Sequence, residues 1–385
     1  MKILVIHASA GAGHLKAAQA IYEGLKKFTS HEAVFADSLD YTSPLFKKFY
    51  QRTYIFLVMG MPWLWGFLFG ILDRPWIQPL MRSSRRFYNG FNAQRLRAFL
   101  KDKNFDYVIT THFLPSEVVA ALKRTGEIRS KLITVVTDFD VHRIWLNPET
   151  DFYAVASEWT GQKLRQLGVA QENIRVTGIP VNETFLHPVD RGELKKKLGL
   201  KENVFTVLIA TGSFGIGPIE DILRILELPA GSSPRPKAPR GEGTSGLREE
   251  DGLQMLVVCG HNRGLAERLR GANYAGAKIF GLVDNMHELM AASDCMVTKP
   301  GGLSIAEALV SQLPMIFFHP IPGQETNNVR VLREYGIGSM PADVQGIAGE
   351  LRKLKSSRDA HLTALKNTRR LARPSAVRDI IALIE

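Results

Sequence analysis

The sequence predicts an α/β protein made of two Rossmann-like halves, each with a parallel sheet. Short runs of apolar and β-branched residues alternate with helical segments from the N-terminus onward, which is the pattern of strands joined by crossover helices. The same alternation begins a second time at residue 205. The chain has 385 residues, more than one compact domain usually holds. We therefore expect one domain over residues 1–182 and another over residues 183–385.

The expected elements follow from short apolar runs that end in turns. The first half opens with the strand Lys2–His7 and the helix Leu15–Phe28. Its further strands are predicted at Ala33–Asp37, Tyr107–Thr111, Leu132–Thr137, Phe152–Ala156 and Arg175–Thr177. Those of the second half are predicted at Phe205–Thr211, Gln254–Cys259, Lys278–Phe280, Cys295–Thr298 and Met315–Phe318. A helix is expected after Gly217, and the last helix of the chain is expected to pack back on the first half.

The composition favours a globular protein with an anionic partner. Hydrophobic residues make up 45% of the chain and charged residues 23%, which is enough apolar material for real cores. The formal net charge of +11 indicates nucleic acid, an acidic membrane surface or a phosphorylated substrate. Nucleic acid is disfavoured, because the basic residues are dispersed and form no recognised module. Two cysteines, and a first apolar run too short for a signal peptide, favour the cytoplasm.

Two stretches break the alternation. Residues 229–252 are rich in Pro, Gly, Ser and charge, so we expect a flexible surface insert without a chemical role. Tyr54–Leu72 carries no charge over nineteen residues. Its basic flanks are Lys47, Lys48, Arg52, Arg74, Arg82, Arg85 and Arg86.

Three structures fit Tyr54–Leu72: an element in the membrane interface that also contacts an acceptor, a buried core helix, and a transmembrane span. We favour the first. The glycines and the proline of the segment weaken a spanning helix, and its tryptophans and basic flanks suit the headgroup region.

A glycine-rich turn, Ser9–His14, follows the first strand and opens the first helix. Gly11 and Gly13 begin a dinucleotide fingerprint, but Lys16 stands where its third glycine belongs, so a nicotinamide or flavin site is disfavoured. His14 lies at the helix start, where the helix dipole disfavours its charged form. This environment suits a neutral general base. A histidine that only caps or packs the turn is the alternative.

Two further glycine-rich turns lie in the second half, each between a strand and a helix, where backbone N–H groups can bind phosphate. The first contains Gly212 and Ser213. In the second, the N–H groups expected to bind a diphosphate are those of Gly302, Leu303 and Ser304. Glu307, one turn later, can accept hydrogen bonds from both hydroxyl groups of a ribose. The three turns together predict a cleft that closes around a nucleoside diphosphate.

The segment Pro322–Asn328 is dense in amide and carboxylate groups. Three of its side chains can bind the hydroxyl groups of a sugar: Gln324, Glu325 and Asn328. A polar loop that caps the following helix is an equal alternative. The chain shows no metal-ligand spacing of Cys and His, no serine-hydrolase elbow and no Walker loop. We therefore expect no bound metal and no cofactor.

Seven motifs, in this order and spacing, point to one known family. They are SAGAGHLKAAQAI (Ser9–Ile21), TDFDVHRIW (Thr137–Trp145), VTGIPVNETF (Val176–Phe185), CGHN (Cys259–Asn262), FGLVDNMHELMAASD (Phe280–Asp294), KPGGLSIAEAL (Lys299–Leu309) and PGQETNNV (Pro322–Val329). Together they resemble the monogalactosyldiacylglycerol synthase and processive diacylglycerol glucosyltransferase family, relatives of the N-acetylglucosaminyltransferase that completes lipid II. The similarity covers nearly the whole chain.

The resemblance implies a GT-B fold, two facing Rossmann-like domains of which the second holds a UDP-sugar. The uracil would lie against Val283, Asn285 and Met286. The sugar would contact Gln324, Glu325 and Asn328, beside the motif Cys259–Asn262. His14 would be the base on the acceptor side, and Tyr54–Leu72 would contact the acceptor and the membrane.

The reaction implied is an inverting transfer of a hexose from a UDP-sugar to a lipid, with diacylglycerol as the favoured acceptor and without a divalent metal. The enzyme would lie on the anionic inner face of the cell membrane. Three alternatives remain: a transferase that moves N-acetylglucosamine to another glycolipid, a soluble UDP-sugar epimerase of the same fold, and a non-catalytic nucleotide- or lipid-binding protein.

Overall fold

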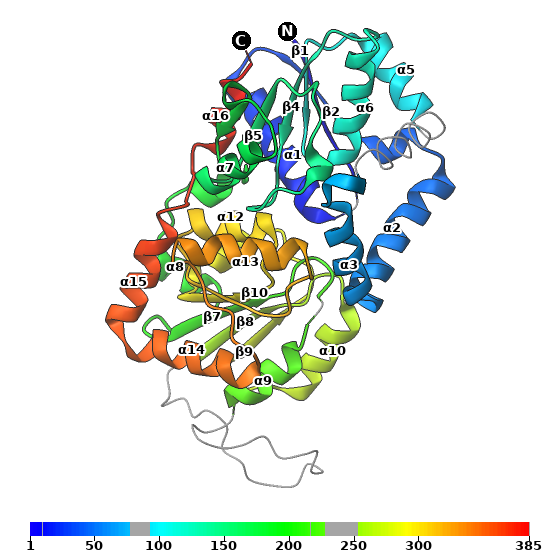
Figure 1. The fold of residues 1–385 in the computed structure, drawn as a ribbon. Coiled ribbons are helices and arrows are strands. Elements are labelled where there is room, and N and C mark those ends of the chain that lie inside the picture. The colour runs from blue at the N-terminus through cyan, green and yellow to red at the C-terminus, as the bar shows by residue number, and fades with distance from the viewer. Residues whose placement is uncertain (10, 78–92, 216, 228–252, 385) are drawn as a thin grey trace.

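A computed structural model describes residues 1–9, 11–77, 93–215, 217–227 and 253–384. Within them, two parallel sheets form two stacked α/β units (Figure 1). The first sheet has six strands in the order β2-β1-β3-β4-β5-β6, and the second has five in the order β11-β10-β7-β8-β9. The prediction of two Rossmann-like halves is confirmed. The predicted boundary between residues 182 and 183 lies in the segment that joins the two sheets.

The strands form where the sequence places runs of β-branched and apolar residues, and most of their side chains are buried. Those of the first sheet are β1 (Lys2–His7), β2 (Glu32–Asp37), β3 (Tyr107–Thr110), β4 (Lys131–Val135), β5 (Phe152–Val155) and β6 (Ile174–Val176). Those of the second are β7 (Phe205–Ala210), β8 (Leu253–Val258), β9 (Ala277–Phe280), β10 (Cys295–Thr298) and β11 (Met315–Phe317). Several end one or two residues before the predicted end, which leaves Thr111 and Thr137 outside the strands.

Helices cover the sheets of both units. In the first unit these are α1 (Ala12–Phe28), α5 (Gln94–Lys103), α6 (Phe113–Arg124) and α7 (Glu158–Gln166). In the second they are α8 (Arg191–Lys197), α9 (Ile219–Glu227), α10 (Arg263–Ala272), α11 (Met286–Ala292), α12 (Gly302–Val310), α13 (Gln324–Glu334), α14 (Val344–Ser356) and α15 (Arg358–Thr368). The last helix, α16 (Ala376–Ile381), returns to the first unit (Figure 1). There Ile380 joins the apolar cluster that also contains Ile21 of α1.

The uncharged segment forms parts of two helices, α2 (Pro44–Gly60) and α3 (Pro62–Leu72), which lie beside the two units (Figure 1). The chain breaks at Met61, because Pro62 has no N–H for an interior helical hydrogen bond and stands at the first turn of α3. Along the described residues no single helix is long and apolar enough to cross a membrane. The pair of helices passes that test jointly, but it is bent by 108°.

None of the residues of α3 is fully buried, so the alternative of a core helix is not supported. The expected insert at residues 229–252 lies outside the described residues, as do the basic residues Arg82, Arg85 and Arg86.

Candidate functional site

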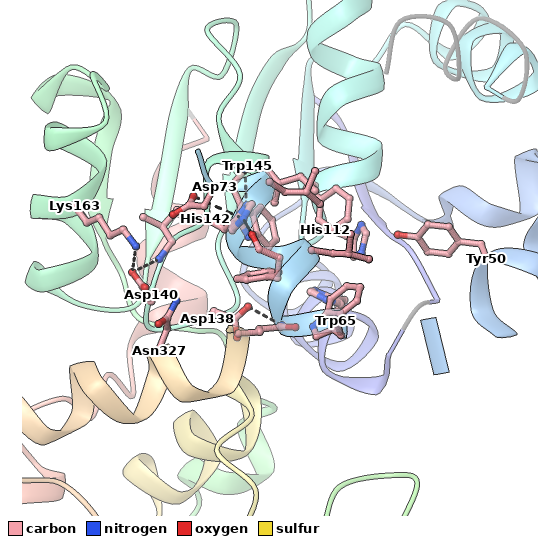
Figure 2. Close-up of a pocket in the computed structure, with 18 residues that line it drawn as sticks. Tyr50, Trp65, Asp73, His112, Asp138, Asp140, His142, Trp145, Lys163 and Asn327 are labelled. Carbon is pink, nitrogen blue, oxygen red and sulfur yellow. Dashed lines mark hydrogen bonds and ion pairs between the residues drawn. The ribbon is translucent and has the colours of Figure 1, made fainter. Parts of the chain in front are cut away.

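A cavity of about 170 Å³ lies between the first unit, α3 and the start of α13 (Figure 2). Its walls are largely apolar and include Trp65, Phe69, Phe113 and Trp145. Its polar lining comes mainly from segments that follow strands β3 and β4, and from the start of α1. The carboxyl ends of parallel strands are where such folds gather functional groups.

His14, the third residue of α1, is fixed at this cavity by two threonines. Its Nδ1 lies 2.7 Å from the carbonyl oxygen of Thr111 and 3.0 Å from Oγ1 of Thr137. A carbonyl oxygen can only accept, so Nδ1 of the neutral ring carries the proton and donates it to Thr111. The other ring nitrogen, Nε2, is left with an unprotonated lone pair.

Burial lowers the pKa of His14 to about 4, against a smaller opposing effect of the hydrogen bond to Thr111. The ring is therefore neutral at physiological pH. A neutral imidazole whose Nδ1–H is held and whose Nε2 is unprotonated is arranged to take a proton from a ligand. The geometry thus suits the role predicted for His14.

Asp138 joins the two units at the floor of the cavity. Its carboxylate accepts hydrogen bonds from Nε2 of Gln324 at 3.0 Å and from Nδ2 of Asn328 at 3.1 Å. Burial raises the pKa of Asp138 to about 6, although both amide hydrogen bonds lower it. The first unit and α13 are therefore connected through one buried carboxyl group.

Asn328 is completely buried and uses both ends of its amide. Its Nδ2 also donates to the carbonyl oxygen of Pro300 at 3.1 Å, and its Oδ1 accepts from the backbone N–H of Phe139 at 2.8 Å. A sugar contact from Asn328 would require these bonds to break, whereas Gln324 lines the cavity directly. The sugar-binding roles of Gln324, Glu325 and Asn328 stay predictions.

A second link between the units surrounds Asp140, which is also buried. Its Oδ1 lies 2.6 Å from Nζ of Lys163 on α7, and its Oδ2 lies 3.2 Å from Nη2 of Arg330 on α13. Figure 2 shows Lys163 pointing at Asp140. Of the two cationic partners only Arg330 belongs to the second unit, so its ion pair with Asp140 connects the units beside the cavity.

The start of α12 lies against the first unit. Its N-cap, Gly301, provides no side-chain cap, and no side chain in the described part of the chain accepts from the first N–H groups of the helix. A side chain at Gly302 would overlap the carbonyl group of Thr137, so only glycine fits at this contact. The predicted diphosphate site, Gly302, Leu303 and Ser304, is thereby close to the turn that holds His14.

Glu307 lies on α12 and is almost fully buried, 4.0 Å from Nζ of Lys16 on α1. Burial raises its pKa to about 7, and Lys16 opposes that effect. A buried carboxyl group with one cationic neighbour can still accept further hydrogen bonds, as the predicted ribose contact requires.

The other predicted donor-site residues lie at the carboxyl ends of the second sheet. The carbonyl oxygen of Ser213, after β7, accepts from the backbone N–H of His261 at 2.8 Å, so the Gly212–Ser213 turn contacts the predicted Cys259–Asn262 motif. Asn285 precedes α11, and Val283 and Met286 pack against the cluster that contains Leu303. Glu325 accepts from the N–H of Ile321 at 2.7 Å, and burial raises its pKa.

No group of three His, Cys, Asp or Glu side chains that could hold a metal ion occurs in the described ranges.

α3 presents apolar side chains on two faces. Trp65, Leu68, Phe69 and Leu72 follow helical spacing and line the cavity. On another face, Trp63 is 67% exposed and Phe67 is 61% exposed. A helix that is apolar all round is expected to be covered on every side, in a protein core or by a membrane.

Sequence reasoning missed several residues of the site. Thr111 and His112 come directly after β3, which pairs with β1. The sequence feature that could have identified them as site residues is their position at the carboxyl end of a predicted parallel strand. Lys163 and Arg330 gave no local signal, because their partner Asp140 is distant in sequence and only the packing of the units brings them together.

Two family profiles match this chain. That of monogalactosyldiacylglycerol (MGDG) synthase matches residues 14–181, and that of the glycosyltransferase family 28 C-terminal domain matches residues 241–346. The chain is 29% identical over 342 residues to a processive diacylglycerol beta-glucosyltransferase of Bacillus pumilus. The aligned region covers 87% of this chain and 82% of that protein. The resemblance predicted from the motifs is confirmed.

Solved structures share the fold over the whole chain. The UDP complex of Staphylococcus aureus MnaA has a TM-score of 0.63 at 14% identity, with 99% of this chain and 95% of that chain covered. The MurG structure from Acinetobacter baumannii has a TM-score of 0.60 at 15% identity, with 100% and 99% covered. The expected GT-B architecture is therefore confirmed.

Proposed function

We propose, from the premise that this chain belongs to the monogalactosyldiacylglycerol synthase family of GT-B glycosyltransferases, that it transfers a hexose from a UDP-sugar to a hydroxyl group of a lipid, with diacylglycerol as the favoured acceptor. One observation carries the assignment of the site. The neutral His14 lies at an apolar cavity and, through Thr137, next to the start of α12. A base is thus placed between a space suited to a lipid and a helix end suited to a diphosphate.

In the proposed reaction, Nε2 of His14 takes the proton of the acceptor hydroxyl group as its oxygen attacks the anomeric carbon. The bond from that carbon to the diphosphate breaks and UDP leaves, so the configuration inverts. The N–H groups of Gly302, Leu303 and Ser304 meet the charge that develops on the leaving diphosphate. The proposal includes no metal ion and no cofactor.

The second unit binds the donor in this proposal. Glu307 accepts hydrogen bonds from the ribose, and Gly212 and Ser213 flank the phosphates. Val283, Asn285 and Met286 contact the uracil, as the family resemblance implies. Gln324 is the best placed of the three candidates for the sugar, because its side chain lines the cavity and is oriented by Asp138.

The enzyme binds peripherally to the inner, anionic face of the cell membrane through α2, α3 and the turn after them. We call their exposed apolar residues the outer apolar surface: Leu45, Phe49, Phe56, Trp63, Phe67 and Trp76, all more than 60% exposed. Exposed basic residues lie on the same elements, Lys48, Arg52 and Arg74. Apolar side chains with basic neighbours are typical of proteins that lie on a membrane, and the net charge of +11 adds attraction to anionic lipid.

The decisive experiment is product analysis with the purified protein. UDP-glucose, UDP-galactose and UDP-N-acetylglucosamine are each incubated with vesicles that contain diacylglycerol, and the lipids are identified by mass spectrometry. We expect a monohexosyl lipid of inverted anomeric configuration. Epimerised UDP-sugar without a glycolipid would instead identify an epimerase, and UDP binding without any turnover would identify a nucleotide-binding protein.

A further inference from the structure

Two histidines at the cavity are held in the same way but differ in one hydrogen bond. His112 precedes α6, and His142 precedes a short helical turn. Nδ1 of His112 accepts from the N–H of Leu114 at 3.1 Å, and Nδ1 of His142 accepts from the N–H of Ile144 at 3.0 Å. Because Nδ1 accepts in both, the neutral rings carry their proton on Nε2.

The Nε2–H groups have different surroundings. That of His142 donates to the carbonyl oxygen of Phe69 on α3, at 2.9 Å. That of His112 makes no hydrogen bond within the described part of the chain, where the ring is fixed through Nδ1 alone and lines the cavity. An imidazole N–H at the wall of a cavity, with no partner among these residues, is available to donate a hydrogen bond to a ligand.

His112 also lies beside the base. The ring centroids of His14 and His112 are 4.6 Å apart, and the planes are nearly perpendicular at 83°. Burial lowers the pKa of His112 well below its usual value, with a further contribution from His14, so the ring is neutral. The two rings are complementary: His14 offers a lone pair on Nε2, and His112 offers a proton on Nε2.

We propose that His112 binds the reacting hydroxyl group of the acceptor, its Nε2–H donating to the oxygen whose own proton points to Nε2 of His14. This inference rests on the proposed function and assigns the acceptor its second polar contact. Two aromatic rings of the cavity wall, Phe113 and Trp145, lie beside His112. With both contacts made, one lone pair of the hydroxyl oxygen is held by His112 and the other is free to attack the anomeric carbon. Because both rings form a hydrogen bond with the hydroxyl group, a lipid alcohol should bind better than a lipid that has no hydroxyl group.

The test uses His112→Asn, because asparagine is a strong N-cap that can still accept from Leu114, while its amide is too short to reach the position of Nε2. The variant therefore removes the donor and keeps the cap. We expect kcat/KM for diacylglycerol to fall about 10- to 100-fold, the effect of losing one hydrogen bond to a reacting group. UDP affinity and the melting temperature should stay close to those of the wild type. His112→Gln, whose longer amide can again place an N–H in the cavity, should recover part of the loss.

A binding measurement makes the inference independent of turnover. Tryptophan fluorescence is used to compare the affinity for diacylglycerol with that for the 1,2-diacyl ester of propanediol, which lacks the free hydroxyl group. The wild type should prefer diacylglycerol, and His112→Asn should lose most of that preference. If wild type makes no glycolipid but this difference is found, the proposed function fails and the hydroxyl-binding role stands.

Two results would overturn the role of His112. One is a folded His112→Asn protein with kcat/KM within about twofold of the wild type, well below the effect of a lost hydrogen bond, and with an unchanged preference for the alcohol. The other is a loss of UDP affinity and a lowered melting temperature in parallel with the loss of lipid transfer, which would make His112 a structural residue.

Discussion

Thr111 contacts His14 twice: its carbonyl oxygen lies 2.7 Å from Nδ1, and its hydroxyl group donates to the carbonyl oxygen of His14 at 2.9 Å. The first contact selects the tautomer with an unprotonated Nε2. The second ties the end of β3 to the first turn of α1. A single residue thus sets both the chemistry and the position of the proposed base.

Replacing His14 by Ala should lower kcat by about 10²–10⁴-fold, the usual contribution of a positioned acid or base. UDP affinity should be nearly unchanged, because the predicted donor contacts belong to the second unit. Steady-state kinetics and calorimetry test the two parts. A variant that keeps more than about a tenth of the wild-type kcat would show that His14 is structural.

The protonation of His14 should follow its lowered pKa of about 4. The unfolded chain binds this proton near pH 6.5, so between these two values the unfolded state holds more protons. The contribution of His14 to stability should therefore fall as the pH drops from about 6.5 to about 4. The imidazole resonances, followed by NMR against a His14→Gln control, should titrate near 4. A midpoint at 6.5 would contradict the burial of the ring.

At a pH above the raised pKa of Glu307, about 7, where the carboxylate is ionised, Glu307→Ala should weaken UDP binding by about 1.5–3 kcal/mol, the range for hydrogen bonds to a charged group. The reason is the loss of the only carboxylate predicted to meet the ribose. Isothermal titration calorimetry measures the effect, with Glu23→Ala, on an exposed part of α1, as a control for a lost surface carboxylate. Equal affinities of wild type and Glu307→Ala would place the ribose elsewhere.

Turnover should continue in EDTA. In the proposed reaction the uncapped start of α12 provides the positive end of a helix dipole for the leaving diphosphate. Rates are compared in EDTA and after addition of Mg²⁺ or Mn²⁺. Activity that disappears in EDTA and returns with either ion would refute metal-independent transfer.

The parts of the site that the sequence predicts are those with a local cause. Runs of apolar and β-branched residues place the strands, and glycines beside a strand end place the turns at His14 and Gly302. The proline expected to weaken a spanning helix in the uncharged segment is Pro62, and the helix breaks directly before it, at Met61.

Contacts across the interface have no local signal. Asn328 and Asp138 are 190 residues apart, so no local pattern of residues predicts the hydrogen bond between them. His112 escaped for a related reason. Its position at the cavity and beside the ring of His14 depends on how β1, β3 and α1 meet.

The two apolar faces of α3 should have separable functions. Trp63→Ser combined with Phe67→Ser removes apolar groups from the outer apolar surface, so binding to anionic vesicles should weaken. Trp65→Ala alters the cavity wall instead and should raise KM for diacylglycerol while vesicle binding persists. Vesicle flotation and lipid-transfer kinetics give the two readouts. UDP affinity should be the same in both variants, because α3 contributes none of the predicted donor contacts.

Salt distinguishes the two contributions to membrane binding. The attraction of Lys48, Arg52 and Arg74 to anionic lipid is screened over a Debye length of about 8 Å at physiological ionic strength, whereas apolar contact is not. Binding of the wild type to anionic vesicles should therefore decrease with added salt without disappearing. Binding of the Trp63 and Phe67 double variant should disappear when salt is added, because its apolar contact is also reduced. Wild-type protein that resists carbonate and high-salt washing would mean that the bent pair α2 and α3 inserts into the bilayer. If the wild-type protein does not bind vesicles at all, the outer apolar surface contacts another partner and not a membrane.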